Sequence, residues 1–425
     1  MLALEDAFGV QIEPDQIPIL QDVGTIKAFF GCSSTTQIST RTVPHQEPEL
    51  GIRSNPAVHR GLTNLFIDNT RVSHVDGESG ILEYRGYSIH DLVAQSSFEE
   101  TAYLLFHGEL PRPAELSEFI SCIEVARAVP TEILDLMREL RHAHPADALR
   151  TGVSALAMFN PEDNQDLLHS GVRLIAQVPI LIGAHHAARQ GREFALPSPS
   201  LSFAEHALSL LLGARPRPSD IRVMDRDLIL HAELAANPSA FAARIAISCN
   251  AGMHAAITAA IAAFAGPLHG GAAEQVLKMI DTIGEPEKAE TYVAERRALN
   301  QPVMGFGHRV FRVEDPSVRH FRESALRISR ERGDMRGYNV IQAVVDATRP
   351  YSRYGVNANV DLYAGLIYRM LGLPDDLTVP IFVVGRMAGW VAQALEQRDS
   401  NILIYPVLNY VGATERILPP RAKAS

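Results

Sequence analysis

The chain has 425 residues, of which 46% are hydrophobic and 21% charged, and its formal net charge is −10. A single compact core rarely grows beyond about 250 to 300 residues, so this length predicts two domains. The acidic balance excludes a general binder of nucleic acid or of anionic membranes, because such partners require a positive face.

The predicted elements change character along the chain. Residues 1–60 mix β-branched residues with Ser, Thr, Pro and Gly, which predicts an irregular arm with short strands. From about residue 80 to about 410, apolar residues recur at spacings of three and four between Gly and Pro stops. The fold class is therefore mainly α.

Membrane and secretion signals are weak. The N-terminal stretch MLALEDAFGV is acidic and lacks the basic region of a signal peptide. The longest uncharged stretch, between Arg244 and Glu274, is rich in Ala and Gly and fits a buried helix better than a membrane span. The cysteines Cys32, Cys122 and Cys249 are far apart and odd in number, which favours reduced core residues. We expect a cytoplasmic protein with no membrane and no nucleic-acid partner.

The stretch LILHAELAANPSAF, residues 228–241, places His231 beside Glu233. Three interpretations are open: a metal ligand, a catalytic base, or a buried histidine on an apolar helix. H-x-E occurs in zinc deaminases, but these also need P-C-x-x-C, which is missing, and there is no H-E-x-x-H. We therefore predict no metal site here.

The stretch GPLHGGAAEQVLKMI, residues 266–280, leaves His269 on a turn before a predicted helix. The positive end of the helix macrodipole disfavours imidazolium, so the ring is expected to be neutral. A neutral imidazole can donate a hydrogen bond to a developing enolate, as it does in triosephosphate isomerase. A turn histidine without function is the alternative.

The stretch VMGFGHRVFRVEDPS, residues 303–317, combines a glycine turn with basic residues. Gly305 and Gly307 free the backbone for close approach to a ligand, and His308, Arg309 and Arg312 follow. A dinucleotide fingerprint would need a third glycine. The pattern indicates a turn that presents a histidine and arginines to a phosphorylated ligand.

The stretch NANVDLYAGLIYRMLGLP, residues 357–374, places Asp361 at the start of an apolar helical run. A carboxylate that caps the helix is one interpretation. The other is a carboxylate base in a mostly apolar site, where desolvation raises its basicity.

Taken in order, PLHGGAAE, MGFGHRVFRVEDP and NVDLYAG resemble the citrate synthase family, and the similarity extends over about residues 62 to 412. The resemblance implies a two-domain helical fold. It assigns an arm to residues 1–60, a large domain to 61–274 completed by 386–425, and a small closing domain to 275–385. It also implies a homodimer or a hexamer of dimers.

The activity that the resemblance implies is condensation of an acyl-CoA, usually acetyl-CoA, with a 2-oxo acid, followed by thioester hydrolysis. Asp361 matches the base that removes the α-proton, His269 the group that stabilises the enol, and His308 the group that polarises the acceptor carbonyl. No cofactor or metal is implied, since coenzyme A enters as a thioester substrate. The remaining matches are Arg312, Gly305 and Gly307 on the coenzyme A side, and Arg386, His231 and Asn237 on the acceptor side.

Departures from the family pattern concentrate on the acceptor. Leu234 stands where the family has an acceptor-binding histidine, and Ser317 and Tyr405 stand where it has arginines. Ala273 replaces an asparagine next to the enol-stabilising turn. Each charge-assisted hydrogen bond to a carboxylate contributes roughly 1.5 to 3 kcal/mol, so these losses would weaken oxaloacetate binding.

Three hypotheses follow for the function. The first is a condensing enzyme whose acceptor is an oxaloacetate analogue, such as phosphonopyruvate or a less charged 2-oxo acid. The second is an ordinary citrate or 2-methylcitrate synthase with a rearranged acceptor site. The third is a non-catalytic member of the family that acts as a regulator.

Overall fold

The computed structural model describes residues 58–62, 65–160, 165–198 and 200–417. The arm predicted for residues 1–60 therefore lies almost entirely outside the described residues. The described part is mainly α-helical, as predicted, with one small antiparallel sheet of order β1-β2-β3. The strands are β1 (Ser73–Asp76), β2 (Ile81–Tyr84) and β3 (Tyr87–Ser88). They follow the predicted arm and belong to the segment that was assigned to the large helical domain.

The helices before the middle of the chain start at residues that favour helix ends. Ser97 forms a capping box with Glu100, and Gly108 ends that helix in the left-handed conformation at φ 89°. Proline occupies the first turn of several others, where its missing N–H costs nothing. These helices are α3 (Ile89–Gln95), α4 (Phe98–His107), α5 (Pro113–Ala126), α6 (Thr131–Glu139), α7 (Pro145–Leu156), α8 (Leu167–Arg189), α9 (Phe203–Leu212) and α10 (Pro218–His231).

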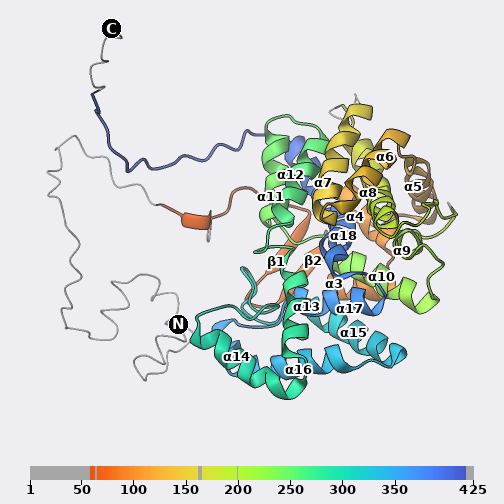
Figure 1. Ribbon diagram of the computed structural model, residues 1–425. Helices are drawn as coiled ribbons and strands as arrows, with labels where there is room; N and C mark the ends of the chain where they lie inside the picture. The colour runs from red at the N-terminus through yellow and green to blue at the C-terminus, as the bar shows by residue number, and fades with distance from the viewer. Residues whose placement is uncertain (1–57, 63–64, 161–164, 199, 418–425) are drawn as a thin grey trace, which may run out of the picture.

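The second half of the chain adds eight more helices. They are α11 (Pro238–Ser248), α12 (Met253–Phe264), α13 (Ala272–Ile283), α14 (Ala289–Ala298), α15 (Val318–Arg332), α16 (Arg336–Thr348), α17 (Asp361–Met370) and α18 (Thr378–Asp399). Helices α13 to α17 pack on one another and form the lower lobe in Figure 1, below the helices of the larger lobe. That arrangement is consistent with the predicted boundary near residue 275, and closure of one lobe over the other remains a prediction.

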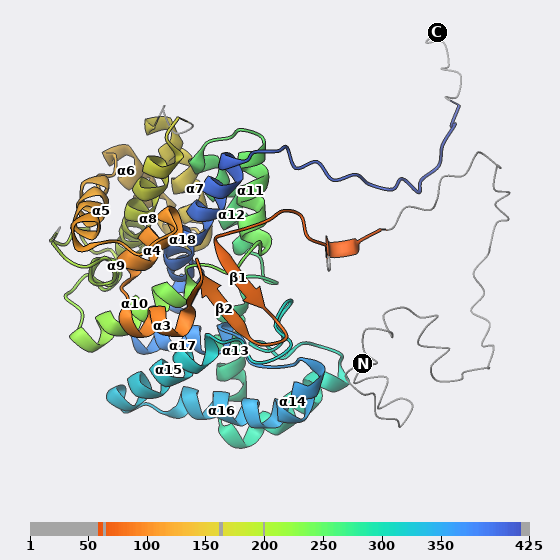
Figure 2. The ribbon, with the colours of Figure 1, turned by 180° about the vertical axis from the view of Figure 1, so that it is seen from behind.

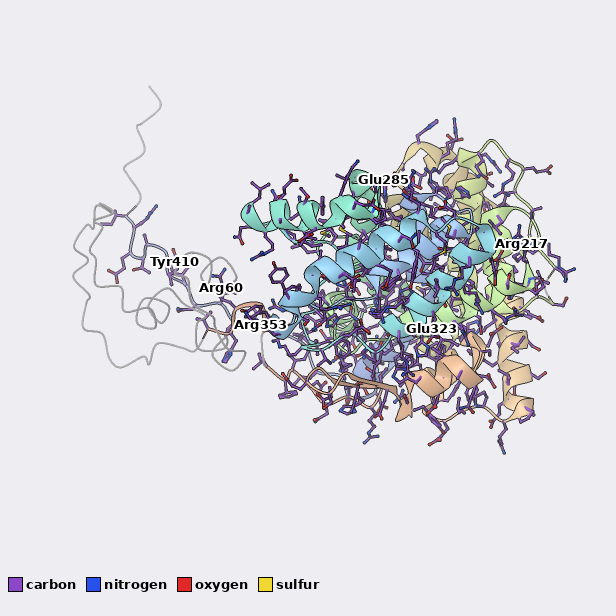
Figure 3. All side chains as sticks on the ribbon, turned by 90° about the horizontal axis from the view of Figure 1, so that it is seen from below. Arg60, Arg217, Glu285, Glu323, Arg353 and Tyr410 are labelled. Atoms are coloured by element: carbon purple, nitrogen blue, oxygen red, sulfur yellow. The ribbon has the colours of Figure 1, made fainter. Side chains whose placement is uncertain are left out.

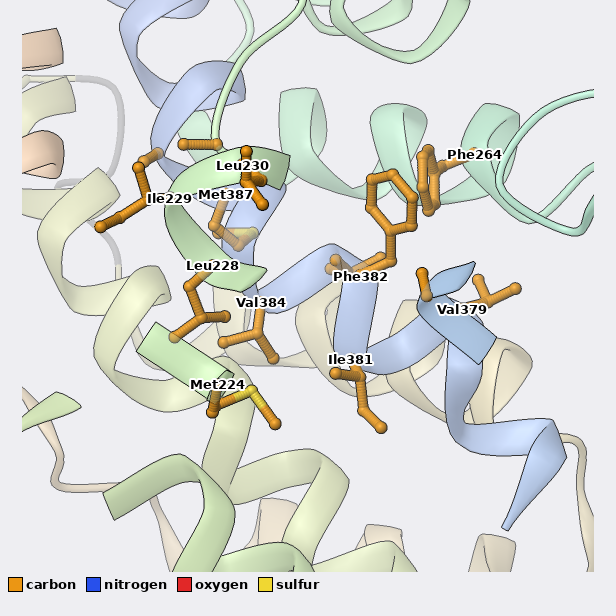
Figure 4. Packing of buried hydrophobic residues seen from close by; sticks show 14 of the residues in the cluster. Met224, Leu228, Ile229, Leu230, Phe264, Val379, Ile381, Phe382, Val384 and Met387 are labelled. Atoms are coloured by element: carbon orange, nitrogen blue, oxygen red, sulfur yellow. The ribbon is translucent and has the colours of Figure 1, made fainter. Parts of the chain in front are cut away.

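The core is organised around α18, which packs against α4, α8, α10, α11 and α12. In Figure 4, Leu228 of α10 lies toward Val384 of α18, and Phe264 of α12 lies beside Phe382, with ring centroids 4.8 Å apart. Two segments, Leu167–Arg189 and Asp375–Asp399, are long and apolar enough to cross a membrane by composition alone, but 83% and 100% of their apolar windows are buried inside the protein. They are helices of the core.

Two expectations about buried segments had different outcomes. The uncharged stretch after Arg244 includes the end of α11 and the whole of α12, whose large apolar residues are buried as expected, whereas Ile245 and Leu268 are exposed. The cysteine prediction was wrong in part: Cys122 and Cys249 are free but exposed. Cys122 lies on the outer face of α5 and Cys249 at the C-terminal end of α11, where no core contact covers them.

Residues 400–417 leave the body without regular secondary structure. Ser248 holds the start of this C-terminal arm, because its hydroxyl accepts from the Ile404 N–H at 3.2 Å and its carbonyl accepts from Asn401. Beyond that point the chain runs away from the helices, as Figures 1 and 2 show, and Tyr410 stands clear of the body in Figure 3. Tyr405 is 80% exposed and Leu408 is 95% exposed.

Candidate active site

His308 has its protonation state fixed by the loop that follows it. Its Nδ1 lies 3.0 Å from the N–H of Val310 and 2.9 Å from that of Phe311, and both groups can only donate. Nδ1 must therefore be the unprotonated acceptor, which leaves the proton on Nε2. Burial, followed by the charge of Arg312, lowers the pKa of His308 to about 4. The ring is a neutral donor at neutral pH.

The glycine turn before this histidine is fastened to the segment that leads into α17. The N–H of Gly307 donates to Asn357 O at 2.8 Å, and the N–H of Asn359 donates to Gly305 O at 3.0 Å. The Asn359 side chain also donates to Gly307 O at 2.9 Å. Both glycines have positive φ, 82° and 83°, which other residues rarely adopt. The clasp fixes the histidine loop relative to the start of α17.

Alanine at these two glycines should have unequal effects. A Cβ on Gly305 would lie 2.7 Å from Leu362 Cδ1 and 3.0 Å from its Cα, whereas one on Gly307 would meet nothing within 4 Å. Both variants carry the left-handed strain of roughly 1 to 2 kcal/mol, and only Gly305→Ala adds the clash. We expect a lower melting temperature for Gly305→Ala than for Gly307→Ala. Equal melting temperatures would contradict the close approach to α17.

Asp361 is the first residue of α17, and its backbone N–H is capped by Asn359 Oδ1 at 3.1 Å. Burial raises the pKa of its carboxyl to about 7, the nearby Asp315 adds to the rise, and Arg386 opposes it. Asp315 is itself buried, with a carboxylate oxygen 2.8 Å from the Ser317 N–H. Desolvation thus gives Asp361 the raised basicity predicted from the apolar sequence around it.

His269 lies in a turn before α13 and is hydrogen-bonded by two side chains, one of which is held in turn by Trp390. Its Nε2 is 2.9 Å from Ser239 Oγ and 3.2 Å from Asn237 Oδ1, and Trp390 Nε1 donates to the same Ser239 oxygen at 3.1 Å. Ser239 Oγ also lies 2.7 Å from Asn237 Oδ1, which can only accept, so the single hydroxyl proton goes either to Oδ1 or to Nε2. If it goes to Asn237, the ring proton is on Nε2; if Ser239 turns it to Nε2, the ring proton is on Nδ1. Burial lowers the pKa of His269 to about 4, with help from Arg386. The ring is neutral as expected, but burial and Arg386 are the causes rather than the helix macrodipole.

Arg386, in the middle of α18, is a buried cation with 4% of its surface exposed. Its Nε donates to His231 O at 2.5 Å, and its guanidinium lies 5.2 Å from the centroid of the Phe382 ring and 6.0 Å from that of Phe264. It affects the pKa values of both His269 and Asp361. Arg386 is therefore the positive charge that acts on both His269, before α13, and Asp361, at the start of α17.

His231 and Glu233, which are neighbours in the stretch 228–241, do not form one site. His231 Nδ1 lies 3.2 Å from Asp227 Oδ2, which also accepts from the Tyr368 hydroxyl at 2.8 Å. Its ring packs 3.6 Å from the Phe382 centroid, and burial lowers its pKa. The carboxylate of Glu233 is turned to other partners. The geometry agrees with the buried helical histidine, which meets Arg386 through its backbone carbonyl.

The other positions singled out from the sequence differ in burial and in their contacts. Asn237 uses its amide within the protein, since Oδ1 accepts from two N–H groups at the start of α11 and Nδ2 donates to Leu234 O. Leu234 is half-buried in that turn, while Ser317 is buried at the start of α15. Arg312 is exposed, and its backbone pairs with Gly77 O at 2.9 Å. Asn237 thus lies beside His269, and its direct contact with substrate stays a prediction.

Several residues of the site were not found from the sequence. Ser239 and Asn359 lie two positions from predicted residues, so the N-x-S and N-x-D spacings were available signals. Trp390 and Asp315 reach the site only through the packing of α18 and the clasped loop, and no local pattern marks them.

Comparisons with known proteins agree with this geometry. Residues 61–407 match the family model described as citrate synthase, C-terminal domain. The chain is 38% identical over 378 residues to the citrate synthase of Synechocystis sp., covering 86% of this chain and 95% of that protein. It is 38% identical over 380 residues to 2-methylcitrate synthase 2 of Corynebacterium glutamicum, covering 86% and 98%. Among solved structures, the ternary complex of carboxymethyl coenzyme A and oxaloacetate with the citrate synthase of Thermoplasma acidophilum matches with a TM-score of 0.81 and 28% identity, covering 86% and 98%.

Proposed function

Because the chain belongs to the citrate synthase family and is an acyltransferase of that family, we propose that it joins the α-carbon of acetyl-CoA or a related short acyl-CoA to the ketone carbon of a 2-oxo acid, and then hydrolyses the thioester. One observation carries the proposal. A carboxylate of raised basicity, Asp361, and a neutral histidine, His269, lie in the field of the buried cation Arg386. A second neutral histidine, His308, lies on the loop that is hydrogen-bonded to the segment leading into Asp361.

Activation of the acyl-CoA would use one group from each lobe. Asp361 removes the α-proton, and its pKa of about 7 lets it act near neutral pH. His269 donates a hydrogen bond from Nδ1 to the enol oxygen once the Ser239 hydroxyl turns its proton from Asn237 Oδ1 to Nε2. A neutral donor stabilises this oxygen without first losing a proton to the solvent. No metal or cofactor takes part in this scheme.

The acceptor would be held and polarised by the other two groups. The Nε2–H of His308 faces the ketone oxygen and stabilises the alkoxide that forms when the new carbon–carbon bond closes. Arg386 binds a carboxylate of the acceptor, with Phe382 and Phe264 excluding water around it. His231 would position Arg386 through its backbone carbonyl, and Asn237 would position His269 through its side-chain amide oxygen. Gly305 and Gly307 would give the thioester close access to the backbone, and the exposed Arg312 would meet a coenzyme A phosphate.

Oxaloacetate is the acceptor that the relatives favour. Citrate synthases and 2-methylcitrate synthases align with almost their whole length, so the second sequence hypothesis has more support than a divergent acceptor. One specific observation keeps a second candidate, a less charged 2-oxo acid or phosphonopyruvate. Leu234, Ser317 and Tyr405 supply no cation to the acceptor, which leaves Arg386 as the matched family arginine.

A thiol-release assay with a panel of 2-oxo acids tests the proposal. The purified protein is mixed with acetyl-CoA or propionyl-CoA and with oxaloacetate, phosphonopyruvate, pyruvate or 2-oxobutyrate in turn. We expect acceptor-dependent release of coenzyme A, with the highest kcat/KM for oxaloacetate. Highest activity with another member of the panel selects the second candidate. Absence of acceptor-dependent release with every combination would overturn the proposed function.

Leu234→His separates the two acceptor candidates. A histidine in that turn adds one hydrogen bond to a charged acceptor, worth roughly 1.5 to 3 kcal/mol if the pocket is otherwise unchanged. We expect the KM for oxaloacetate to fall about tenfold, with Leu234→Gln as a polar control of similar length. An unchanged KM would mean that Leu234 does not face the acceptor.

We also propose that the protein is a homodimer or a hexamer of dimers in the cytoplasm, with the lobe of residues 275–385 closing over the substrates. The exposed apolar side chains on the C-terminal arm, among them Tyr405, Val407 and Leu408, support the oligomer, because a second copy would cover them.

Light scattering during size-exclusion chromatography checks the oligomer. One chain has a mass of 46.5 kDa, and we expect a particle of at least twice that mass. The variant Leu408→Asp should weaken assembly, whereas Val125→Asp, on the exposed face of α5, should not. A wild-type particle of single-chain mass would contradict the proposal.

A further inference from the structure

Glu233 is a buried carboxylate that the proposed mechanism does not use. We infer that Glu233 is a positioning residue for Arg386: it balances the buried cation while the acceptor site is empty and competes with the acceptor carboxylate for it. The inference rests on the proposed function only in taking Arg386 as the acceptor's carboxylate-binding group. Glu233 has 1% of its surface exposed and Arg386 has 4%. A buried charge is costly unless another charge compensates it, and these two residues supply opposite signs.

The backbone around Glu233 is fixed from three directions. The Tyr84 hydroxyl accepts from the Glu233 N–H at 3.2 Å and lies 3.0 Å from its carbonyl oxygen. The N–H of Gly389 donates to Ala232 O at 2.9 Å, which ties the turn to α18. Since Arg386 Nε donates to the carbonyl of His231, the last residue of α10, Glu233 and Arg386 are anchored to the same few residues.

The side chain of Glu233 lies along the face of α18 that carries Arg386. Its Oε1 accepts from Gln393 Nε2 at 2.8 Å and from Ser73 Oγ at 3.1 Å. A Cβ on Gly389 would lie 2.2 Å from Glu233 Oε2, so the glycine provides the space for this carboxylate. Positions 386, 389 and 393 share one face of the helix. The glycine therefore admits a carboxylate on the face of α18 that carries the guanidinium.

The second carboxylate oxygen of Glu233 is unpaired. Oε2 is buried and has no hydrogen-bond partner among the described residues. Burial lowers the pKa of Arg386, and Glu233 is the foremost charged group that opposes this; burial raises the pKa of Glu233, and Arg386 is the foremost group that opposes that rise. Glu233 therefore supplies the proposed acceptor site with a carboxylate that interacts electrostatically with Arg386.

Binding of an acceptor should then change the protonation of Glu233. Burial raises its pKa to about 7 against the opposing effect of Arg386. The other titratable groups that act on Arg386 are Tyr84, Asp361 and Asp315. A bound carboxylate adds negative charge beside Glu233 and favours its neutral form, so the protein should take up protons on binding near pH 7.

Calorimetric titration of oxaloacetate, without acyl-CoA, into the full chain tests the inference. Titrations at pH 7 in buffers of different ionisation enthalpy give the number of protons taken up, which we expect to be a fraction of one for the wild type. Glu233→Gln keeps the shape and the Oε1 contacts and removes the charge. We expect it to bind oxaloacetate roughly tenfold more tightly and to abolish most of the proton uptake. The matched control is Glu99→Gln, a buried carboxylate that caps α9 at Phe203 N and should leave both quantities unchanged.

The outcomes separate the inference from the proposed function. If wild-type affinity and proton uptake persist in Glu233→Gln, the inference is wrong while the condensing activity can still stand. If the wild type binds oxaloacetate but releases no thiol, while the variant shows the expected changes, the inference holds and the proposed function is wrong. Wild-type binding with no proton uptake near pH 7, or no binding to either protein, overturns the inference. These wild-type measurements decide it even if the variant does not fold.

Discussion

Replacing Asp361 by asparagine is expected to lower kcat for thiol release by roughly 10²- to 10⁴-fold, the usual contribution of a positioned general base. The asparagine side chain has nearly the same shape and cannot accept the α-proton. Its effect on acyl-CoA and acceptor KM should be small, because the proposed role of Asp361 lies in the proton transfer. Steady-state kinetics with the acceptor chosen by the panel measures both parameters.

The control for this variant is Asp135→Asn, an exposed carboxylate on α6 paired with Arg138. It makes the same chemical change away from the site and should leave kcat unchanged. Retention of most of the wild-type kcat by Asp361→Asn would show that another group removes the proton.

The same carboxylate should set the acid limb of the pH profile. Its pKa is raised to about 7, and the base acts in its ionised form, so kcat at saturating acceptor, where changes in acceptor affinity through Glu233 do not count, should fall as the pH drops below about 7. His269 and His308, with pKa values near 4, remain neutral over that range and add no break. Asp361→Asn should lose this dependence in whatever activity remains. A profile flat down to pH 5 would contradict the raised basicity.

Arg386→Lys is the second change with a large expected effect. Lysine keeps the positive charge but loses the planar fork and the Nε–H that donates to His231 O. Loss of charge-assisted hydrogen bonds worth roughly 1.5 to 3 kcal/mol should raise acceptor KM about 10- to 100-fold. The KM for acyl-CoA should change much less, which distinguishes loss of an acceptor contact from general damage.

Arg189→Lys provides the comparison, since Arg189 pairs with Asp376 at the surface. That pair is partly exposed and should contribute little, so acceptor KM should stay near the wild-type value. An equal rise in both KM values for Arg386→Lys would point to a structural role alone.

The helical class could be predicted from the sequence because its signals are local, and the candidate site residues were marked by local signals as well. Apolar periodicity and Gly and Pro stops marked the helices, and the turn before α13, the glycine turn and the start of α17 each carry a short pattern. The strands at 73–88 were not predicted, because strands of two to four residues give almost no periodic signal.

What the sequence could not supply is contact over long separations. The bond from Trp390 to Ser239 and the one from Gln393 to Glu233 each span about 150 positions or more. They exist because α18 runs through the middle of the larger lobe. The interpretation of His231 was open for the same reason: its burial against Phe382 and Phe321 depends on helices distant in the chain.

The clasp between the glycine turn and the start of α17 has a consequence for how this enzyme could diversify. It joins Asp361, the proposed base, and His308, the proposed carbonyl-polarising group, into one reactive unit, whereas Arg386 belongs to α18 and Glu233 and Leu234 to the turn after α10. Substitutions in the latter group can alter acceptor choice while the spacing of the reactive unit is preserved. The departures from the family pattern at Leu234 and Tyr405 lie outside that unit. The residues around Arg386 are therefore the natural target for changing which acceptor the enzyme prefers.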